Sequence, residues 1–253
     1  LDPYRKRYAG ENLKRFGDSL DIMVGRKKRY DSHSVMYHYP GLAAIEFFDR
    51  AGFPWLDAFE AATDRIRDEF LAILVADEGF VPYITYPDDV PQNQFAELNN
   101  SPRWTSYEFY RQGQPIADRC ERAPATLRAV RALPQADVPL RSPVAMYSAL
   151  QPRTRIPPHT GVANFRLVVH LPLVIPPGCG FRVGSETREW RVGESWVFDD
   201  TIEHEAWNDS DVPRYILICD IWNPRLSPQE RAAIAGVIAA TDAFNGTVPS
   251  AQV

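Results

Sequence analysis

Three of the five histidines in this 253-residue sequence, His159, His170 and His204, fall within one stretch of 46 residues. His159 precedes Thr160-Gly161, where we expect a loop to enter a strand, and His204 follows just after another expected strand. Imidazoles from two neighbouring strand ends can supply two nitrogen ligands to one metal ion, and imidazole suits iron, zinc, copper and nickel alike. The spacing indicates a metal site at His159 and His204 without choosing the metal. The alternative is that each histidine is a hydrogen-bonded core or loop residue.

Arg214 is the second residue that could do chemistry, because it begins the apolar run Tyr215 to Ile221. A guanidinium on a strand destined for burial needs an anionic partner, and its planar fork matches a carboxylate. Asp209 and Asp211 are near enough in sequence to form a surface ion pair with it. The functional alternative is that Arg214 holds the far carboxylate of a small diacid whose other end chelates the metal.

The elements that would position these residues change character along the chain. Apolar residues recur at helical spacing from Trp55 to Ile73, and a shorter helix is expected over 123–133. A C-terminal helix is expected over 227–241, with Ser227 as N-cap, Pro228 in the first turn and Glu230 closing a capping box. Short β-rich runs separated by Gly, Pro and Asp lie between these helices, at 144–150, 164–174, 180–183, 189–192, 195–198 and 214–222. The pattern predicts a mainly β protein, a β-sandwich core with helices packed on one face.

Composition narrows the function classes. Hydrophobic residues make up 45% and charged residues 24% of the chain, as in ordinary globular proteins. The net charge of −5 argues against a broad nucleic-acid-binding surface. No apolar run approaches the roughly 18–20 residues of a membrane span. Three scattered cysteines suit a reducing compartment, so we expect a cytoplasmic protein. The chain starts at Leu1, which leaves an upstream anchor or domain open.

Two stretches resemble a known family. The first runs from Pro158-His159-Thr160-Gly161 through Asn164 and Arg166-Leu167 to His170-Leu171. The second contains Phe198-Asp199-Asp200, Glu203-His204-Glu205 and Trp207, and is followed by Arg214 and Asp220-Ile221-Trp222. Together they resemble the aspartyl/asparaginyl β-hydroxylases, which are iron(II)- and 2-oxoglutarate-dependent oxygenases with a double-stranded β-helix (jelly-roll, cupin-like) core. The resemblance implies one such domain over 1–253, with a helical or irregular part at 1–142, the jelly roll at about 143–224 and the C-terminal helix behind it.

The resemblance also implies roles for individual residues. His159 and His204 match the iron ligands, and Ser148, His170 and Arg214 match residues that bind the cosubstrate 2-oxoglutarate. The third ligand usual in this superfamily, a carboxylate two residues after the first histidine, is replaced by Gly161. A water would fill that position, and Asp200 is the expected partner of this water. Arg166 and Trp104 match positions near the substrate. One position departs from the family pattern, because Val168 stands where the animal enzymes often carry a basic residue.

These features predict a hydroxylase that uses iron(II), 2-oxoglutarate and O2 on an unactivated C–H bond and releases succinate and CO2. The expected substrate is the side chain of aspartate, asparagine or another amino acid, free, in a peptide or carrier-bound. Two alternatives remain open: a lipid acyl-chain hydroxylase of the same family, and a non-catalytic cupin-like module that binds a metal or a sugar. The substrate, the carbon attacked and the oligomeric state do not follow from the sequence.

Overall fold

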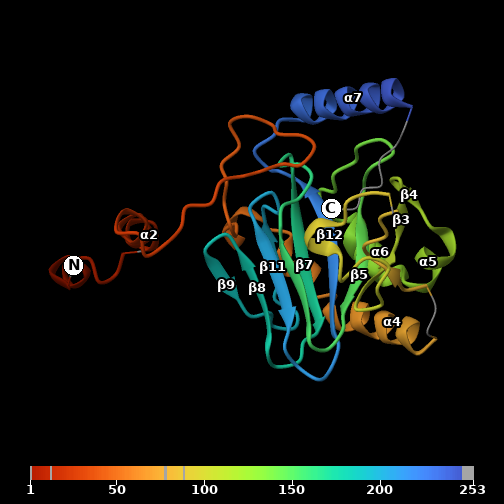
Figure 1. The fold of residues 1–253 in the computed structure, drawn as a ribbon, viewed down its shortest axis with the longest axis horizontal. Helices are drawn as coiled ribbons and strands as arrows, with labels where there is room; N and C mark the ends of the chain where they lie inside the picture. Colours follow the sequence, from red (N-terminus) through yellow and green to blue (C-terminus); the bar gives the residue numbers. More distant parts are fainter. Residues whose placement is uncertain (1, 12, 77–78, 88, 247–253) are drawn as a thin grey trace.

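A computed structural model describes residues 2–11, 13–76, 79–87 and 89–246 of the chain (Figure 1). The centre of the fold is formed by eight strands between Ala145 and Trp222. These strands are β5 (Ala145–Leu150), β6 (Thr154–His159), β7 (Arg166–Val174), β8 (Cys179–Val183), β9 (Glu186–Arg188), β10 (Trp196–Phe198), β11 (His204–Asn208) and β12 (Arg214–Trp222).

The strand order identifies the fold. One sheet has the order β1-β2-β5-β12-β7-β10 and the other β6-β11-β8-β9. Counted from β5 as the first strand, the eight central strands form the orders 1-8-3-6 and 2-7-4-5, and each pairs with its neighbours in antiparallel fashion. This arrangement of two facing sheets is a jelly roll, the architecture of cupins. The predicted fold class, mainly β with flanking helices around a jelly-roll core, is confirmed.

Alternation along the strands gives the larger sheet two different faces. On β7, Leu167, Val169 and Leu171 contribute to a core that includes residues of the helices α4 (Thr63–Val75) and α6 (Pro124–Arg131). The intervening residues Val168 and His170 face the smaller sheet. Since successive side chains point to opposite faces of a sheet, one strand serves both the helical layer and the space between the sheets. Figure 1 shows α4 and α6 on the outer side of the larger sheet.

The structure corrects several boundaries. The segment expected to be helical or irregular, 1–142, also contributes strands, of which β1 (Val81–Pro82) and β2 (Trp104–Glu108) extend the larger sheet, while β3 (Tyr110–Arg111) and β4 (Gln114–Pro115) form a small hairpin. The strand predicted at 189–192 is wrong, because β9 ends at Arg188 and the chain turns at Gly193, which has a positive φ of 79°. Trp190 lies in the loop that follows β9, and its side chain is buried although it is not part of a strand. Strands β6 and β11 were not predicted.

The remaining helices surround this core. Helix α7 (Pro228–Asn245) begins with the predicted capping box between Ser227 and Glu230. The N-terminal helices α1 (Asp2–Arg7) and α2 (Lys14–Met23) extend away from the body (Figure 1). In the part of the chain that the structure describes, no helix is both long and apolar enough to cross a bilayer. The short helical elements are η1 (Arg50–Gly52), α3 (Leu56–Glu60), η2 (Asn93–Phe95) and α5 (Ala117–Arg122).

Candidate active site

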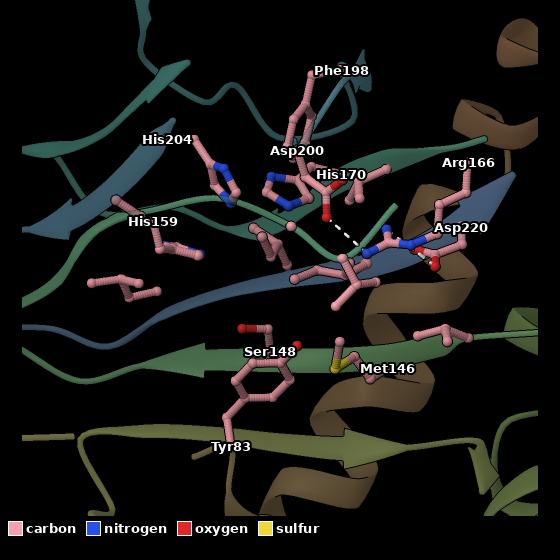
Figure 2. A pocket seen from close by; sticks show the side chains of 18 of the residues that line it. Tyr83, Met146, Ser148, His159, Arg166, His170, Phe198, Asp200, His204 and Asp220 are labelled. Carbon is pink, nitrogen blue, oxygen red and sulfur yellow. Dashed lines mark hydrogen bonds and ion pairs between the residues drawn. The ribbon is translucent and has the colours of Figure 1, made fainter. Parts of the chain in front are cut away.

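A cavity of about 420 Å³ lies between the two sheets and is lined by the residues that the sequence predicted for the site. Figure 2 shows the rings of His159 and His204 directed into this space, near Asp200 and His170. The lining residues used below are Ser148, His159, Arg166, Val168, His170, Trp190, Asp200, His204, Arg214 and Asp220. Trp104 also lines the cavity. The structure therefore brings together all eight predicted site residues.

His159 and His204 face each other across neighbouring strands. They are directly paired in the register of β6 with β11, and their ring centroids are 4.1 Å apart. Strand β6 contains Pro157 and Pro158, which an edge strand tolerates because proline cannot donate to a ladder. His159 is the last residue of β6 and His204 the first residue of β11, so both lie at neighbouring strand ends as expected, although His159 ends a strand rather than entering one and His204 begins a strand rather than following one. The pairing in the sheet fixes the separation of the two rings.

Backbone carbonyls orient the two imidazoles. His159 Nδ1 lies 2.7 Å from the carbonyl oxygen of Pro157, and His204 Nδ1 lies 3.0 Å from that of Ile202. A carbonyl only accepts hydrogen bonds, so each Nδ1 carries the proton and each Nε2 keeps its lone pair. This is the tautomer that a metal-binding histidine needs, with its second nitrogen anchored by a neighbour.

The surroundings keep both rings uncharged. Burial, with a further contribution from His204, lowers the pKa of His159 to about 3. Burial likewise lowers the pKa of His204 to about 4. Since a metal binds the neutral imidazole, the two rings are in the ligand form at neutral pH. Within the described residues, no group of three or more His, Cys, Asp or Glu side chains is arranged to hold a metal, so the pair stands without a third protein ligand.

Asp200 fills the space that a side chain at position 161 would enter. A Cβ built on Gly161 would clash with the carboxylate of Asp200, and the Gly161 amide donates to the Asp200 carbonyl at 2.7 Å. Position 161 must therefore be glycine as long as this carboxylate stays in place. The other oxygen, Asp200 Oδ1, is buried and has no hydrogen-bond partner among the described residues. It is an acceptor available to a ligand.

Arg166 joins Asp200 to a second buried carboxylate. Its Nη2 donates to Asp200 Oδ2 at 2.8 Å, and its Nη1 lies 3.2 Å from Asp220 Oδ2 (dashed lines in Figure 2). Burial, together with the charge of Asp200, raises the pKa of Asp220 to about 6, although Arg166 opposes this shift. We did not predict a role for Asp220. The signal was present, since an acidic residue within the apolar strand β12 needs a buried cation.

Arg214 lies at the end of the cavity opposite Arg166, and it is only 1% exposed. Its Nη1 is 3.4 Å from the carbonyl oxygen of Ser148 and 3.5 Å from Ser148 Oγ, and its guanidinium lies 5.0 Å from the Trp190 ring centroid. The surface ion pair considered for it is absent, because Asp209 pairs with Arg155 and Asp211 with Arg153. No carboxylate of the described chain pairs with it, and burial lowers its pKa to about 10.

Ser148, Trp104 and His170 complete the Arg214 end. Trp104 Nε1 donates to Ser148 Oγ at 3.3 Å. His170 packs between Phe181 and Phe198, at ring-centroid distances of 5.0 and 4.7 Å. His170 Nδ1 and Arg214 Nε are buried without a hydrogen-bond partner among the described residues. Leaving such groups unpaired costs about 1–3 kcal/mol each, so the cavity is built for a polar ligand with acceptor atoms. A metal-chelating diacid fits these residues.

A cupin-like jelly roll with two neutral, oriented imidazoles in its cavity is thus defined by fold and site. The aspartyl/asparaginyl beta-hydroxylase family model matches residues 60–224, and the chain belongs to this family. It is 35% identical to the human aspartyl/asparaginyl beta-hydroxylase over 239 residues, which cover 87% of this chain and 30% of that protein. It is 28% identical to the ornithine lipid ester-linked acyl 2-hydroxylase of Rhizobium tropici, covering 78% of this chain and 67% of that protein.

The chain spans about a third of the length of the human relative. Among solved structures, the cupin domain of an XRE family transcriptional regulator from Enterobacter cloacae aligns with a TM-score of 0.32 and 10% identity. This alignment covers 48% of our chain and 98% of that domain. The family identification made from the two histidine motifs is confirmed, and with it membership of a family of hydroxylases.

Proposed function

We propose that this hydroxylase uses iron(II), 2-oxoglutarate and O2, with His159 and His204 holding the metal. One observation carries the proposal: a buried arginine without a carboxylate partner in the described chain shares a cavity with two neutral, oriented imidazoles. The first feature calls for an anionic ligand and the second for a metal ion. A keto diacid that chelates the metal satisfies both.

Each residue of the Arg214 end has a definite task in this proposal. Arg214 pairs with the far carboxylate of 2-oxoglutarate, since a guanidinium binds a carboxylate bidentately. Ser148 adds a hydroxyl to the same carboxylate while Trp104 holds its oxygen in place. His170 contributes Nδ1, which has no other hydrogen-bond partner in the described structure. When bound, the metal and the keto acid supply the oxidation by O2 that converts a substrate C–H bond to C–OH, with release of succinate and CO2.

Asp200 acts in this proposal as the partner of a water rather than as a ligand. Its free Oδ1 can accept a hydrogen bond from a water beside the two histidines, and Arg166 holds its other oxygen. Outer carboxylates of this kind change metal affinity by about 10–100-fold. Aromatic side chains around the histidines exclude further water, among them Phe95, whose ring centroid is 5.3 Å from that of His159.

The proposal is tested by anaerobic titration of the metal-free protein with iron(II) and 2-oxoglutarate. A weak visible charge-transfer band is expected only when both are present, and succinate should form slowly once air is admitted. A protein that binds iron(II) without developing the band, and releases no succinate, would instead be a metal-binding module without redox chemistry. Zinc(II) in place of iron(II) is the control, because it should bind and give neither signal.

The relatives limit the substrate only broadly. One is named for aspartyl and asparaginyl side chains and another for an acyl chain of ornithine lipid. We propose that this chain hydroxylates an aliphatic carbon of an amino-acid side chain or an acyl chain. We also propose a cytoplasmic location, which is supported by Cys120, Cys179 and Cys219 all being free thiols.

A further inference from the structure

The end of the cavity opposite Arg214 has no free positive charge to offer a substrate. We call it the Arg166 end, formed by Val35, Met36, Val144, Met146, Phe165, Arg166, Val168 and Asp220. Arg166 is paired with two carboxylates, those of Asp200 and Asp220. Two acidic groups against one guanidinium leave this buried cluster without a net positive charge. Arg141, the other cation nearby, forms a salt bridge with Asp242 of α7.

Val168 lies at the centre of this end. It is 6% exposed, stands between Arg166 and His170 on the cavity face of β7, and is paired with Asp220 on one side and Phe198 on the other. A basic side chain here would reach Asp220 and release Arg166 from one of its partners. Valine does neither, so Asp220 stays with Arg166. The side chain at position 168 thus decides whether Arg166 keeps both of its carboxylate partners.

Apolar side chains line most of the rest of the Arg166 end, and the polar residues beside them, Arg141 and Ser142, are engaged by Asp242 and by the backbone N–H of Val138. Val144, just before β5, and Met146 of β5 line this end, and Figure 2 shows Met146 on the same strand as Ser148. At the mouth, the segment 32–39 is held by backbone hydrogen bonds, with Val35 donating to Gly161 and Met36 to Val162. The side chains of Val35 and Met36 line the cavity, yet these residues are 66% and 42% exposed.

An anionic group would bind poorly in this environment. It would lose its hydration, face Asp200 and Asp220, and find no unpaired cation among the described residues of the Arg166 end, since Arg166 and Arg141 are both paired. Burying an ion without a partner costs several kcal/mol. An aliphatic group loses no hydration energy there and gains from leaving water, by about 25 cal/mol for each Å² buried.

We propose that the Arg166 end selects an uncharged aliphatic group of the substrate, and that Val168 sets this selectivity. The inference rests on the proposed function, because it assigns the Arg214 end to the keto acid. It names a substrate class different from the acidic side chain in the name of the human relative.

The test compares three ligands that differ only in the side chain, the N-acetyl amides of leucine, aspartate and lysine. Binding is followed by tryptophan fluorescence from Trp104 and Trp190 in anaerobic protein loaded with zinc(II) and 2-oxoglutarate, and again without either. The leucine amide should bind at least about tenfold more tightly than the aspartate amide, a difference of about 1.4 kcal/mol. Val168→Arg should reverse the order, whereas Val237→Arg, on an exposed position of α7, should not.

A second pair of variants covers the case in which Val168→Arg does not fold. Val35→Glu places a charge at the exposed mouth and should weaken binding of the leucine amide several-fold, while Val237→Glu leaves it unchanged. Equal or tighter binding of the aspartate or lysine amide by the wild-type protein would overturn the inference. If the leucine amide binds but 2-oxoglutarate never does, the proposed function fails while the selectivity of this end remains.

Discussion

The carboxylate of Asp200 fills the space that a side chain at Gly161 would occupy. The two residues are 39 positions apart in sequence. In the structure, the carboxylate of Asp200 can occupy its place only because residue 161 has no side chain. A carboxylate therefore lies close to the histidine pair even though the usual acidic ligand position is a glycine. It comes from the β10–β11 loop and is held by Arg166.

The first prediction concerns Gly161→Ala. The added methyl group meets the carboxylate of Asp200, so the variant should be less stable by about 1–3 kcal/mol, as for other overpacked sites. It should also bind metal more weakly, because Asp200 must move. Gly236→Ala is the matched control, since a Cβ there meets nothing within 4 Å and should stabilise α7 by about 0.5–1 kcal/mol. Urea denaturation measures the change in stability of both variants. A Gly161→Ala variant as stable as the wild type would contradict the close contact between position 161 and Asp200.

The second prediction concerns Arg214→Ala. We expect the dissociation constant of 2-oxoglutarate to rise by about 100-fold or more, since a buried charge-assisted pair is worth about 3–5 kcal/mol when one partner is removed. Iron(II) binding in the absence of 2-oxoglutarate should change little. Arg153→Ala removes an exposed arginine that pairs with Asp211 and should leave both constants unchanged. Equal losses of metal and keto acid in Arg214→Ala would count against the assigned role.

The third prediction concerns Asp200→Asn. The amide cannot keep the charged interaction with Arg166, and it offers a weaker acceptor to the proposed water. Iron(II) affinity should fall by about 10–100-fold, with binding measured by competition with a chelating dye. Asp209→Asn, at the exposed end of β11, serves as the control. An unchanged affinity in Asp200→Asn would show that its carboxylate plays no part in metal binding.

The fourth prediction concerns pH. Burial, reinforced by Arg214 and His204, lowers the pKa of His170 well below its ordinary value of 6.5. The unfolded chain therefore takes up a proton below pH 6.5 that the folded chain does not bind. The contribution of His170 to stability is present above pH 6.5 and declines as the pH falls toward the folded pKa.

His170→Asn removes this effect. Between pH 6 and pH 5, the free energy of unfolding of the metal-free variant should fall less steeply than that of the wild type, by about 1.4 kcal/mol per pH unit. Taking the difference between the two proteins cancels the contributions of Asp199 and Asp220, whose pKa values burial raises to about 6. Parallel curves would show that His170 is protonated in the folded protein.

Features with a local cause were predictable from the sequence. The capping box of α7 depends on Ser227 and Glu230 alone, and it was predicted correctly. The long strand β12 was predicted from its apolar run. The position of Arg214 at the start of this run indicated an anionic ligand. His159 and His204 were paired because both were expected at neighbouring strand ends, and the family resemblance then matched them to the iron ligands.

Features that depend on distant partners were not predictable. Strand β6 contains two adjacent prolines and β11 is the mixed run His204–Asn208, so neither has the composition of a strand. They form because each strand supplies backbone hydrogen-bond partners to the other in an antiparallel ladder. Likewise, nothing local indicates that Arg166 is held by two carboxylates, since Asp200 and Asp220 come from other parts of the chain.

Both imidazoles are steered by a carbonyl of their own strand or turn, two residues earlier in each case. Main-chain oxygens are present whatever the side chain, so no point substitution at Pro157 or Ile202 can delete them. The orientation of the two rings is consequently determined by the path of the backbone. Substitutions of the surrounding side chains therefore leave the direction of the two rings unchanged as long as the backbone keeps its path.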